Sequence, residues 1–235
     1  MTQIQNKVDQ SAEFYNQSFL SFDFKLAEFG FDTLKSYFKG EIALELGPAS
    51  GYMTGLLAKE FKTLHIVEGS KVLLDQIPEY ENVKKHCSLF EEFKTDIKFD
   101  TIVMSHVLEH ISEPVSVLKQ IREWLKDDGV FLVAVPNAKS LHRTVAVEMG
   151  LLSDEHQLNQ RDHDLGHYRV YDLPMLRSHL EEASFIIKKM GGYFLKPLTN
   201  SQIDKHWDDA MIQGFYEAGK KFPEICAEIF AVVKK

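Results

Sequence analysis

The stretch from Ile42 to Thr54, which reads IALELGPASGYMT, decides the fold of this chain. Its apolar first half is typical of a buried strand, and the GPASG run then interrupts the strand with two glycines, Gly47 and Gly51. Apolar residues resume at helical spacing immediately afterwards. The stretch therefore predicts a strand, a tight glycine turn and the start of a helix.

A ligand is expected at this turn, because glycines let it approach main-chain N–H groups at a helix N-terminus. A nucleotide-like ligand suits such a site. The dinucleotide pattern G-x-G-x-x-G needs a second glycine where this chain has Ala49, so a pyrophosphate is disfavoured. A turn without a ligand would explain the glycines but not Glu45, because an unpaired carboxylate buried in an apolar strand is costly.

The segment 45–51, ELGPASG, resembles motif I of the class I S-adenosylmethionine-dependent methyltransferases. In that family the glycine turn passes under the methionine part of the cofactor, and the acidic residue helps to hold its amino group. The resemblance implies S-adenosyl-L-methionine as cofactor and S-adenosyl-L-homocysteine as product. It also implies an α/β fold with a doubly wound seven-stranded sheet in the order 3-2-1-4-5-7-6, the last strand antiparallel.

A second short apolar strand, Thr63 to Val67, ends in Glu68. An acidic residue about 20 residues after the glycine turn is expected to bind the two hydroxyls of a ribose. A lone acid at a strand end is usually only solvated. Here the strand, the spacing and the motif agree, and we predict that Glu68 binds the adenosine part of the cofactor.

The segment 99–110, FDTIVMSHVLEH, resembles motif IV and the HVLEHI signature of the ubiquinone/menaquinone-methyltransferase-like, small-molecule branch. The resemblance places Ser105 and His106 beside the methionine moiety and the reactive methyl group. Glu109 and His110 are expected to begin a helical segment and to serve structure. His106 is expected to be either a packed wall or a catalytic neighbour.

Further cofactor contacts are carried over from the family. After a third strand, Val83 to His86, the side chains next to the adenine would be Ser88 and Leu89, although the usual acidic residue is absent. An N-terminal aromatic pair, Phe14 and Tyr15, resembles the pair that closes over the cofactor in many small-molecule methyltransferases, with plain core packing as the alternative. The full predicted set is Tyr15, Glu45, Gly47, Pro48, Gly51, Tyr52, Met53, Glu68, Gly69, Ser88, Leu89, Ser105 and His106.

The length of 235 residues predicts one domain, and alternating strands and helices independently predict a doubly wound α/β sheet. The expected parts are an N-terminal helical cap (1–39), a cofactor-binding half (40–137), a polar substrate-facing insertion after the fifth strand (138–170) and a C-terminal part (171–235) with a helical lid at 198–222. The helix after the turn is expected at 52–61 and the fifth strand at 130–137.

Composition narrows the class of protein. No apolar run approaches the roughly 20 residues of a membrane span, and the first residues lack the layout of a signal peptide, so a cytoplasmic protein without a membrane partner is expected. The net charge of −8, without a Lys/Arg stripe, argues against nucleic acid. Two distant cysteines suggest neither a disulfide framework nor a zinc site. We expect a monomer or homodimer.

The polar insertion is expected to carry the substrate chemistry. Methyl transfer from a sulfonium is an in-line displacement, and a base helps when the acceptor is an amine or hydroxyl. Histidine suits this role near neutral pH, and His163 and His167 lead the search, followed by His142 and His106. Two alternatives remain open for these histidines, namely packing and the binding of a divalent metal ion by His163 and His167 with a neighbouring aspartate. A site without metal is preferred.

The acceptor is expected to be a small molecule, and an anionic one would suit the residues predicted to bind it, which are Arg143, Arg161, Tyr168 and Arg169. We predict methylation of an oxygen or nitrogen atom of a small polar metabolite, such as a sugar or another precursor of a surface polysaccharide or secondary metabolite. The rivals are a quinone-type aromatic acceptor, an RNA-modifying enzyme and a cofactor-binding accessory protein without catalysis.

Overall fold

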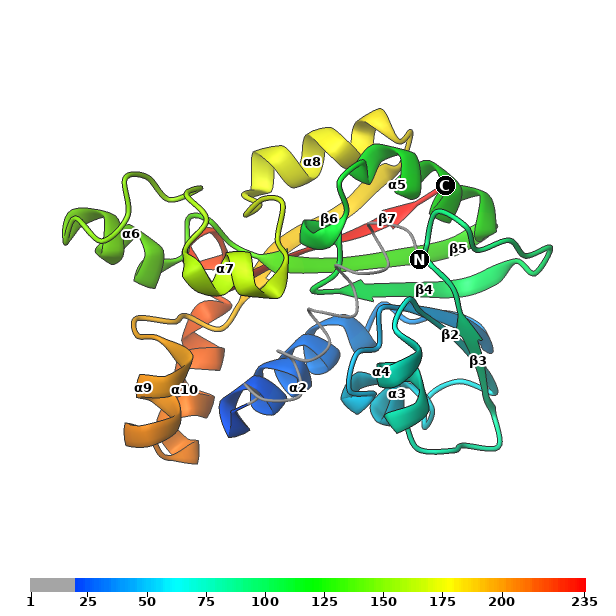
Figure 1. Ribbon diagram of the computed structural model, residues 1–235, viewed down its shortest axis with the longest axis horizontal. Coiled ribbons are helices and arrows are strands. Elements are labelled where there is room, and N and C mark those ends of the chain that lie inside the picture. The colour runs from blue at the N-terminus through cyan, green and yellow to red at the C-terminus, as the bar shows by residue number, and fades with distance from the viewer. Residues whose placement is uncertain (1–19) are drawn as a thin grey trace.

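A seven-stranded sheet in the order β3-β2-β1-β4-β5-β7-β6 forms the centre of the molecule (Figure 1). The computed structural model describes residues 20–235, and the structural statements concern those residues. Strands β1 to β5 pair in parallel, whereas β7 runs antiparallel to both β5 and β6. The strand order and the antiparallel last strand expected from the resemblance are confirmed.

The strands are β1 (Ile42–Leu46), β2 (Thr63–Glu68), β3 (Val83–Cys87), β4 (Phe99–Ser105), β5 (Leu125–Pro136), β6 (Ile186–Tyr193) and β7 (Glu228–Lys234). The α-helices are α2 (Ser21–Lys35), α3 (Tyr52–Leu57), α4 (Lys71–Gln76), α5 (Pro114–Trp124), α6 (Leu141–Glu148), α7 (Gln160–Leu165), α8 (Leu173–Glu182), α9 (Asn200–His206) and α10 (Asp209–Gly219). Two 3₁₀ turns, η1 (Leu108–His110) and η2 (Pro223–Ile225), complete the described elements.

Both faces of the sheet are covered, because successive side chains of a strand point to opposite faces. In β5, Phe131 and Val133 belong to the apolar cluster under α5 and α8. Their neighbours Val130 and Leu132 belong to the cluster with α2, α3, α9 and α10 on the other face. Figure 1 shows α5 and α8 on one side of the sheet and α2, α3 and α4 on the other.

Two expected boundaries were wrong, and tertiary contacts explain both. Strand β5 begins at Leu125, five residues earlier than expected, because Leu125 pairs with Phe99 of β4. Helix α3 ends at Leu57 rather than Phe61. The side-chain amide of Asn82 donates to the carbonyl oxygens of Ala58 and Phe61, at 2.8 Å each, and holds this segment in a turn.

The N-terminal helix α2 packs on a face of the sheet rather than over its edge, since Phe22, Leu26 and Phe29 share one apolar cluster with residues of β1, β4 and β5. The polar insertion contains two helices, α6 and α7, and the segment 198–222 is mostly helical, as expected, with α9 and α10. Helix α9 contacts α2, so segments from the two ends of the described chain meet.

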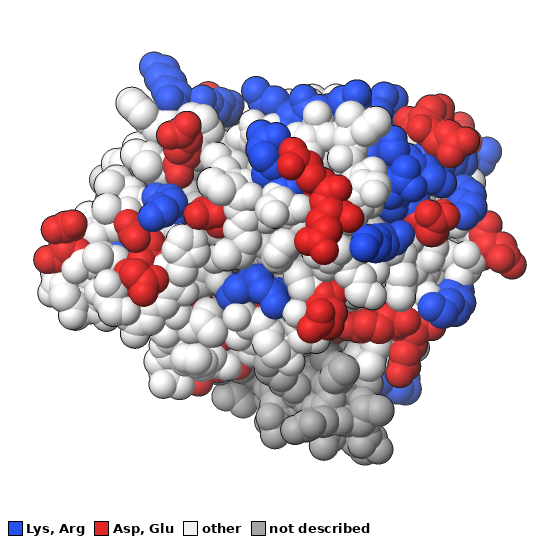
Figure 2. All heavy atoms as spheres, turned by 90° about the horizontal axis from the view of Figure 1, so that it is seen from above, with Lys and Arg blue, Asp and Glu red and all other residues white. Residues whose placement is uncertain are grey.

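In residues 20–235, no helix combines the length and the apolar composition needed to span a membrane. Figure 2 shows the face above α8 and α5, where Lys and Arg side chains lie among Asp and Glu side chains. This face of the described residues therefore carries mixed charge. It does not form one basic area that would attract phosphate groups.

Candidate functional site

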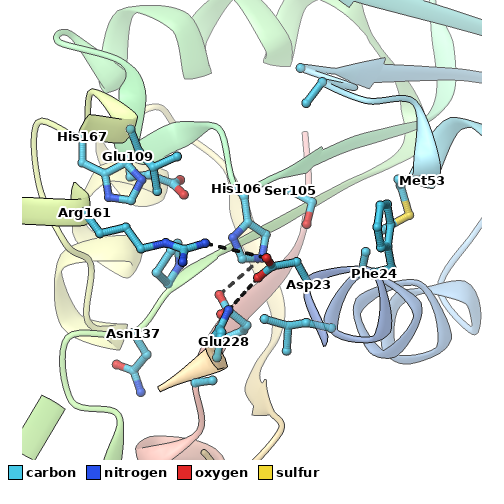
Figure 3. Close-up of a pocket in the computed structure, with 18 of the residues that line it drawn as sticks. Asp23, Phe24, Met53, Ser105, His106, Glu109, Asn137, Arg161, His167 and Glu228 are labelled. Atoms are coloured by element: carbon cyan, nitrogen blue, oxygen red, sulfur yellow. Dashed lines mark hydrogen bonds and ion pairs between the residues drawn. The ribbon is translucent and has the colours of Figure 1, made fainter. Parts of the chain in front are cut away.

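A cavity of about 490 Å³ lies at the edge of the sheet where β1, β4 and β5 end (Figure 3). Parallel strands bring their carboxyl ends to one edge, which is where ligands of such folds bind. The antiparallel β7 begins at this same edge, because Glu228 pairs with Pro136 at the end of β5. Side chains of α2, α6, α7 and α9 complete the wall.

The glycine turn approaches Val107, two residues after β4, too closely for a side chain. Gly47 has a φ of +69°, and a Cβ added there would lie 2.4 Å from a methyl group of Val107. Ala49, the residue that replaces a glycine of the dinucleotide pattern, also has a positive φ of 46°. Both residues line the cavity, so the main chain of the turn is open to a ligand.

Glu45 lines the cavity and is 3% exposed. The hydroxyl group of Thr54 on α3 donates to Glu45 Oε2 at 2.6 Å. Burial raises the pKa of Glu45 to about 7, while this hydrogen bond acts in the opposite direction. A ligand cation at this carboxylate would supply the charge partner that a buried acid needs.

Glu68 is held beside the glycine turn at the end of β2. Its carboxylate accepts hydrogen bonds from the main-chain N–H groups of Ser70 at 2.8 Å and Ala49 at 3.3 Å. Burial raises the pKa of Glu68, and these backbone donors oppose the shift. Glu68 is therefore next to the turn but outside the cavity wall, and its binding to a ribose stays a prediction.

The predicted cofactor residues fall into two groups, those in the cavity wall and those outside it. The cavity wall includes Glu45, Gly47, Pro48, Tyr52, Met53, Ser105 and His106. Gly51, Glu68, Gly69, Ser88 and Leu89 lie around the turn and the ends of β2 and β3, outside that wall. Tyr15 lies outside the described residues.

His106 directly follows β4 and lines the cavity. Its φ of +57° is unusual for a residue with a side chain, and such strain is found often at functional sites. The Nε2 atom lies 3.4 Å from Oε2 of Glu228, a buried residue at the start of β7. Burial raises the pKa of Glu228, and the neighbouring His106 and Lys196 act in the opposite direction.

The three histidines of the insertion that were predicted as bases have different surroundings. His163 is exposed on α7 and does not line the cavity. His167 is buried in the wall, and its Nδ1 lies 3.2 Å from Asp162 Oδ1. His142 also lines the cavity, but burial lowers its pKa to about 2, with Lys196 and Arg143 acting in the same direction. His142 is therefore a weak base, and His163 is out of reach of a ligand in the cavity.

Of the residues predicted to bind the acceptor, Arg143 and Arg161 line the cavity. The Arg143 guanidinium group is committed to the protein: it donates to Asp162 at 3.2 Å and to the carbonyl oxygens of Glu155 and Gln157. Arg161 lies 3.7 Å from Asp23 and is half exposed. Tyr168 and Arg169 lie outside the wall, and Arg169 donates to the carbonyl oxygens of Ile111 and Ser112.

A series of hydrogen bonds along the cavity wall joins polar residues that were not predicted from the sequence. Asn200 Nδ2 donates to Asp23 at 2.6 Å, and Lys196 Nζ donates to Asn200 Oδ1 at 2.8 Å. Lys196 is buried, and burial lowers its pKa. Glu228 had a usable signal, because it is an acid inside an apolar strand, as Glu45 is. The sequence carries no such signal for Asp23 and Asn200, because only the packing of α2 on α9 brings these two residues together.

The cavity thus has two chemically different ends. Figure 3 shows Phe24 and Met53 at one end, Arg161, Asn137 and His167 at the other, and Ser105 and His106 between them. The first end adjoins the glycine turn and Glu45, and it fits an adenosine ligand that carries an ammonium group. The second end presents charged donors and acceptors to a polar molecule.

Comparison with known proteins agrees with this geometry. A family model described as a methyltransferase domain matches residues 25–187. The ubiquinone biosynthesis O-methyltransferase of Haemophilus ducreyi is 30% identical over 111 residues, which cover 47% of this chain and 44% of that protein. The enzyme of the same name from Pasteurella multocida is 26% identical over 196 residues, covering 76% and 78%. The match thus spans less than half of the first relative.

Solved structures share the fold at low sequence identity. A Thermotoga maritima S-adenosylmethionine-dependent methyltransferase, described as a possible histamine N-methyltransferase, superposes with a TM-score of 0.64 at 16% identity, covering 97% of this chain and 99% of that one. The N-methyltransferase NodS of Bradyrhizobium japonicum, solved with S-adenosyl-L-homocysteine, superposes with a TM-score of 0.60 at 12% identity, covering 92% and 88%. At these identities the likeness is one of fold.

Proposed function

Because this chain belongs to the methyltransferase-domain family, we propose that it transfers a methyl group to an oxygen or nitrogen atom of a small polar acceptor. The family match and the strand order are those of a class I methyltransferase that depends on S-adenosyl-L-methionine. When bound, that cofactor supplies a methyl group activated on a sulfonium. The enzyme must then hold the acceptor in line and exclude water.

The cofactor would be held by the glycine turn and the acids around it. The main chain of Gly47 and Ala49 faces the cavity, and Glu45 offers a carboxylate to an ammonium group. The carboxylate of Glu68 would exchange its bond to Ala49 for ribose hydroxyls. The main chain of the turn, which lines the cavity at Gly47 and Ala49 with a positive φ at each, is the observation that supports a closely bound ligand here.

His106 is the residue that we propose as the base. It lies between the two ends of the cavity, and the nearby Glu228 carboxylate can orient its imidazole ring and stabilise the charged form. An acceptor hydroxyl or ammonium group would transfer its proton to the imidazole ring of His106, whose Nε2 faces Glu228. Position favours His106 over His163, and His142 is too weak a base.

The side chains in the wall of the cavity support the proposal that the acceptor is polar. Arg161, Lys196 and Asn200 offer hydrogen-bond donors, and Asp23 and Glu228 offer acceptors. Such alternating groups suit a molecule with several hydroxyl, amino or acidic groups, for example a sugar derivative. The names of the curated relatives favour a second candidate, a quinone-type aromatic hydroxyl.

The test is to follow the label from methyl-labelled S-adenosyl-L-methionine in cell extract separated into polar small molecules, lipids, nucleic acid and protein. We expect label in the polar fraction. Label in the lipid fraction would favour the quinone-type acceptor, and label in nucleic acid or protein would refute the acceptor class. The His106→Gln variant should lose about 100-fold or more in turnover while it binds S-adenosyl-L-homocysteine as the wild type does. Cofactor binding without transfer to any fraction would indicate an accessory protein.

A further inference from the structure

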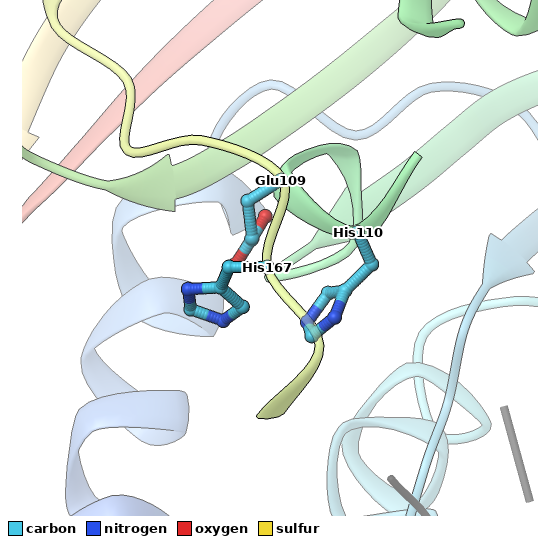
Figure 4. Close-up of side chains that lie close together, drawn as sticks. All are labelled: Glu109, His110 and His167. Atoms are coloured by element: carbon cyan, nitrogen blue, oxygen red, sulfur yellow. The ribbon is translucent and has the colours of Figure 1, made fainter. Parts of the chain in front are cut away.

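Glu109 and His110 of η1 meet His167, which follows α7, beside the polar end of the cavity (Figure 4). Each of the three offers a ligand atom, and these atoms all lie within 4.8 Å of one another. We propose that Glu109, His110 and His167 bind a divalent transition-metal ion. The proposal gives Glu109 and His110 a role beyond the structural one expected from the sequence.

Glu109 carries the strongest observation. The residue is 1% exposed, and neither of its carboxylate oxygens has a hydrogen-bond partner in the described structure. A buried carboxylate without partners is costly. Protonation would remove the charge but would leave the new O–H group without an acceptor. The charges of Glu228 and Asp162 act on the same carboxylate and repel it. A bound cation satisfies both oxygens and offsets this repulsion.

His167 is oriented as a metal ligand commonly is. Its Nδ1 faces Asp162 Oδ1 at 3.2 Å, which leaves Nε2 for an ion. A carboxylate on the other ring nitrogen fixes the tautomer and orientation of a ligating histidine. Asp162 is itself held by Arg143 and by the main-chain N–H of Asn159. The buried Arg143 therefore has a role in this site, because it holds the Asp162 carboxylate that orients His167.

The two imidazole rings are adjacent. Their centroids are 4.6 Å apart in an edge-to-face arrangement. Donors bound tetrahedrally at about 2.1 Å from a zinc ion are roughly 3.4 Å from one another, so small side-chain rotations complete the site. Two nitrogen donors and one oxygen donor suit Zn²⁺, Mn²⁺, Fe²⁺ or Co²⁺ rather than Ca²⁺ or Mg²⁺, which prefer oxygen.

Three protein ligands leave at least one position open on the ion. Glu109 and His167 line the cavity, so the open position faces the acceptor end. An acceptor hydroxyl bound there becomes more acidic and is held in a fixed place. This role of the ion rests on the proposed function, whereas binding of the ion does not.

Metal binding is tested without any acceptor. The protein is treated with a chelator and dialysed, and Zn²⁺, Mn²⁺ and Co²⁺ are then titrated separately by calorimetry, with Co²⁺ also followed by its visible absorption. We expect one equivalent to bind. The conservative Glu109→Gln variant and His167→Ala should bind at least 10-fold more weakly, while S-adenosyl-L-homocysteine affinity reports that both remain folded.

His163→Ala is the matched control, because it removes an exposed histidine four residues from His167. It should bind the ions as the wild type does. Equal loss in His163→Ala and His167→Ala would point to the pair suggested by their sequence spacing and would overturn this ligand set. Wild-type protein that binds none of the three ions, or full affinity in Glu109→Gln, would overturn the site.

The role toward the acceptor has its own test. Once a labelled acceptor fraction is known, chelation should lower turnover, and the ion that binds in the titration should restore it. Turnover that chelation does not change would overturn this role while leaving the proposed methyl transfer in place.

Discussion

Glu45 shows, at the scale of a single residue, how burial and function are joined. Its carboxyl group has a pKa raised to about 7 from an ordinary 4.5, chiefly by burial. Between these values the folded protein retains a proton that the unfolded chain loses. The stability contributed by this proton is therefore present below pH 4.5 and is lost as the pH rises through about 7. A ligand cation beside Glu45 would reverse the preference for the protonated form.

The Glu45→Gln variant tests the direction of this pH dependence of stability. The amide still accepts a hydrogen bond from Thr54 but never ionises. Without ligand, the free energy of unfolding of the variant relative to the wild type should rise with pH between 4.5 and 7, by up to about 3 kcal/mol. Denaturant titrations at several pH values measure this difference. A difference that does not vary with pH would show that Glu45 is ionised in the folded protein.

At the scale of an element, the glycine turn depends on backbone angles that most residues avoid. We expect Gly47→Ala to destabilise the protein by more than about 1 kcal/mol, because the new Cβ meets Val107 at a positive φ. Cofactor affinity should fall with it. Gly214→Ala on α10 is the matched control, since nothing lies within 4 Å of an added Cβ. It should stabilise the protein by about 0.5–1 kcal/mol.

Thermal unfolding and calorimetry with S-adenosyl-L-homocysteine measure both glycine variants. Equal effects of the two substitutions on stability would show that the turn does not need a glycine at position 47 in order to pack against Val107. Similar stability with full ligand affinity in Gly47→Ala would lead to the same conclusion.

Element boundaries were the part of the fold that local patterns predicted least well. The fifth strand was expected to begin at residue 130, yet the polar run Asp127-Asp128-Gly129 also lies inside β5. Lys126 pairs with Asp100 at 2.7 Å, and Leu125 pairs with Phe99, so the neighbouring strand extends β5 backwards. A short stretch of sequence around β5 cannot predict this pairing, because the paired residues of β4 lie more than twenty positions earlier in the chain.

At the scale of the whole molecule, α9 and α2 close one side of the cavity. Asp204 of α9 accepts a hydrogen bond from the main-chain N–H of Phe22 at 2.9 Å. This contact joins residues 182 positions apart and lies next to the Asn200–Asp23 contact. The lid predicted at 198–222 would act through this contact.

Two matched variants test that contact. Asp204→Ala removes the acceptor that joins α9 to α2, whereas Asp208→Ala removes only a local cap, the bond from Met211 N–H to Asp208. Each should cost about 1 kcal/mol of stability. Only Asp204→Ala should speed amide exchange in α2, as measured by hydrogen exchange and mass spectrometry, and should weaken cofactor binding. Similar exchange in both variants would show that α9 does not hold α2.

The sequence by itself determined the strand order, the cofactor and the position of the glycine turn. Those signals lie within short windows: Glu45 and Gly47 adjoin one strand, and Glu68 follows about twenty residues later. Side-chain spacing in such windows is set by covalent geometry and by strand and helix periods. For this reason the resemblance of segments 45–51 and 99–110 was enough to anticipate the fold.

Only the tertiary structure decided which polar side chains share the cavity. His163 and His167 are equivalent in the sequence, but the short helix α7 exposes the first, and the chain after α7 buries the second against Asp162. Lys196 lies in the segment after β6, Asn200 in α9 and Asp23 in α2. Glu109 meets His167 across nearly sixty residues of chain. Such contacts depend on how the helices pack on the sheet, and that packing is a property of the whole chain.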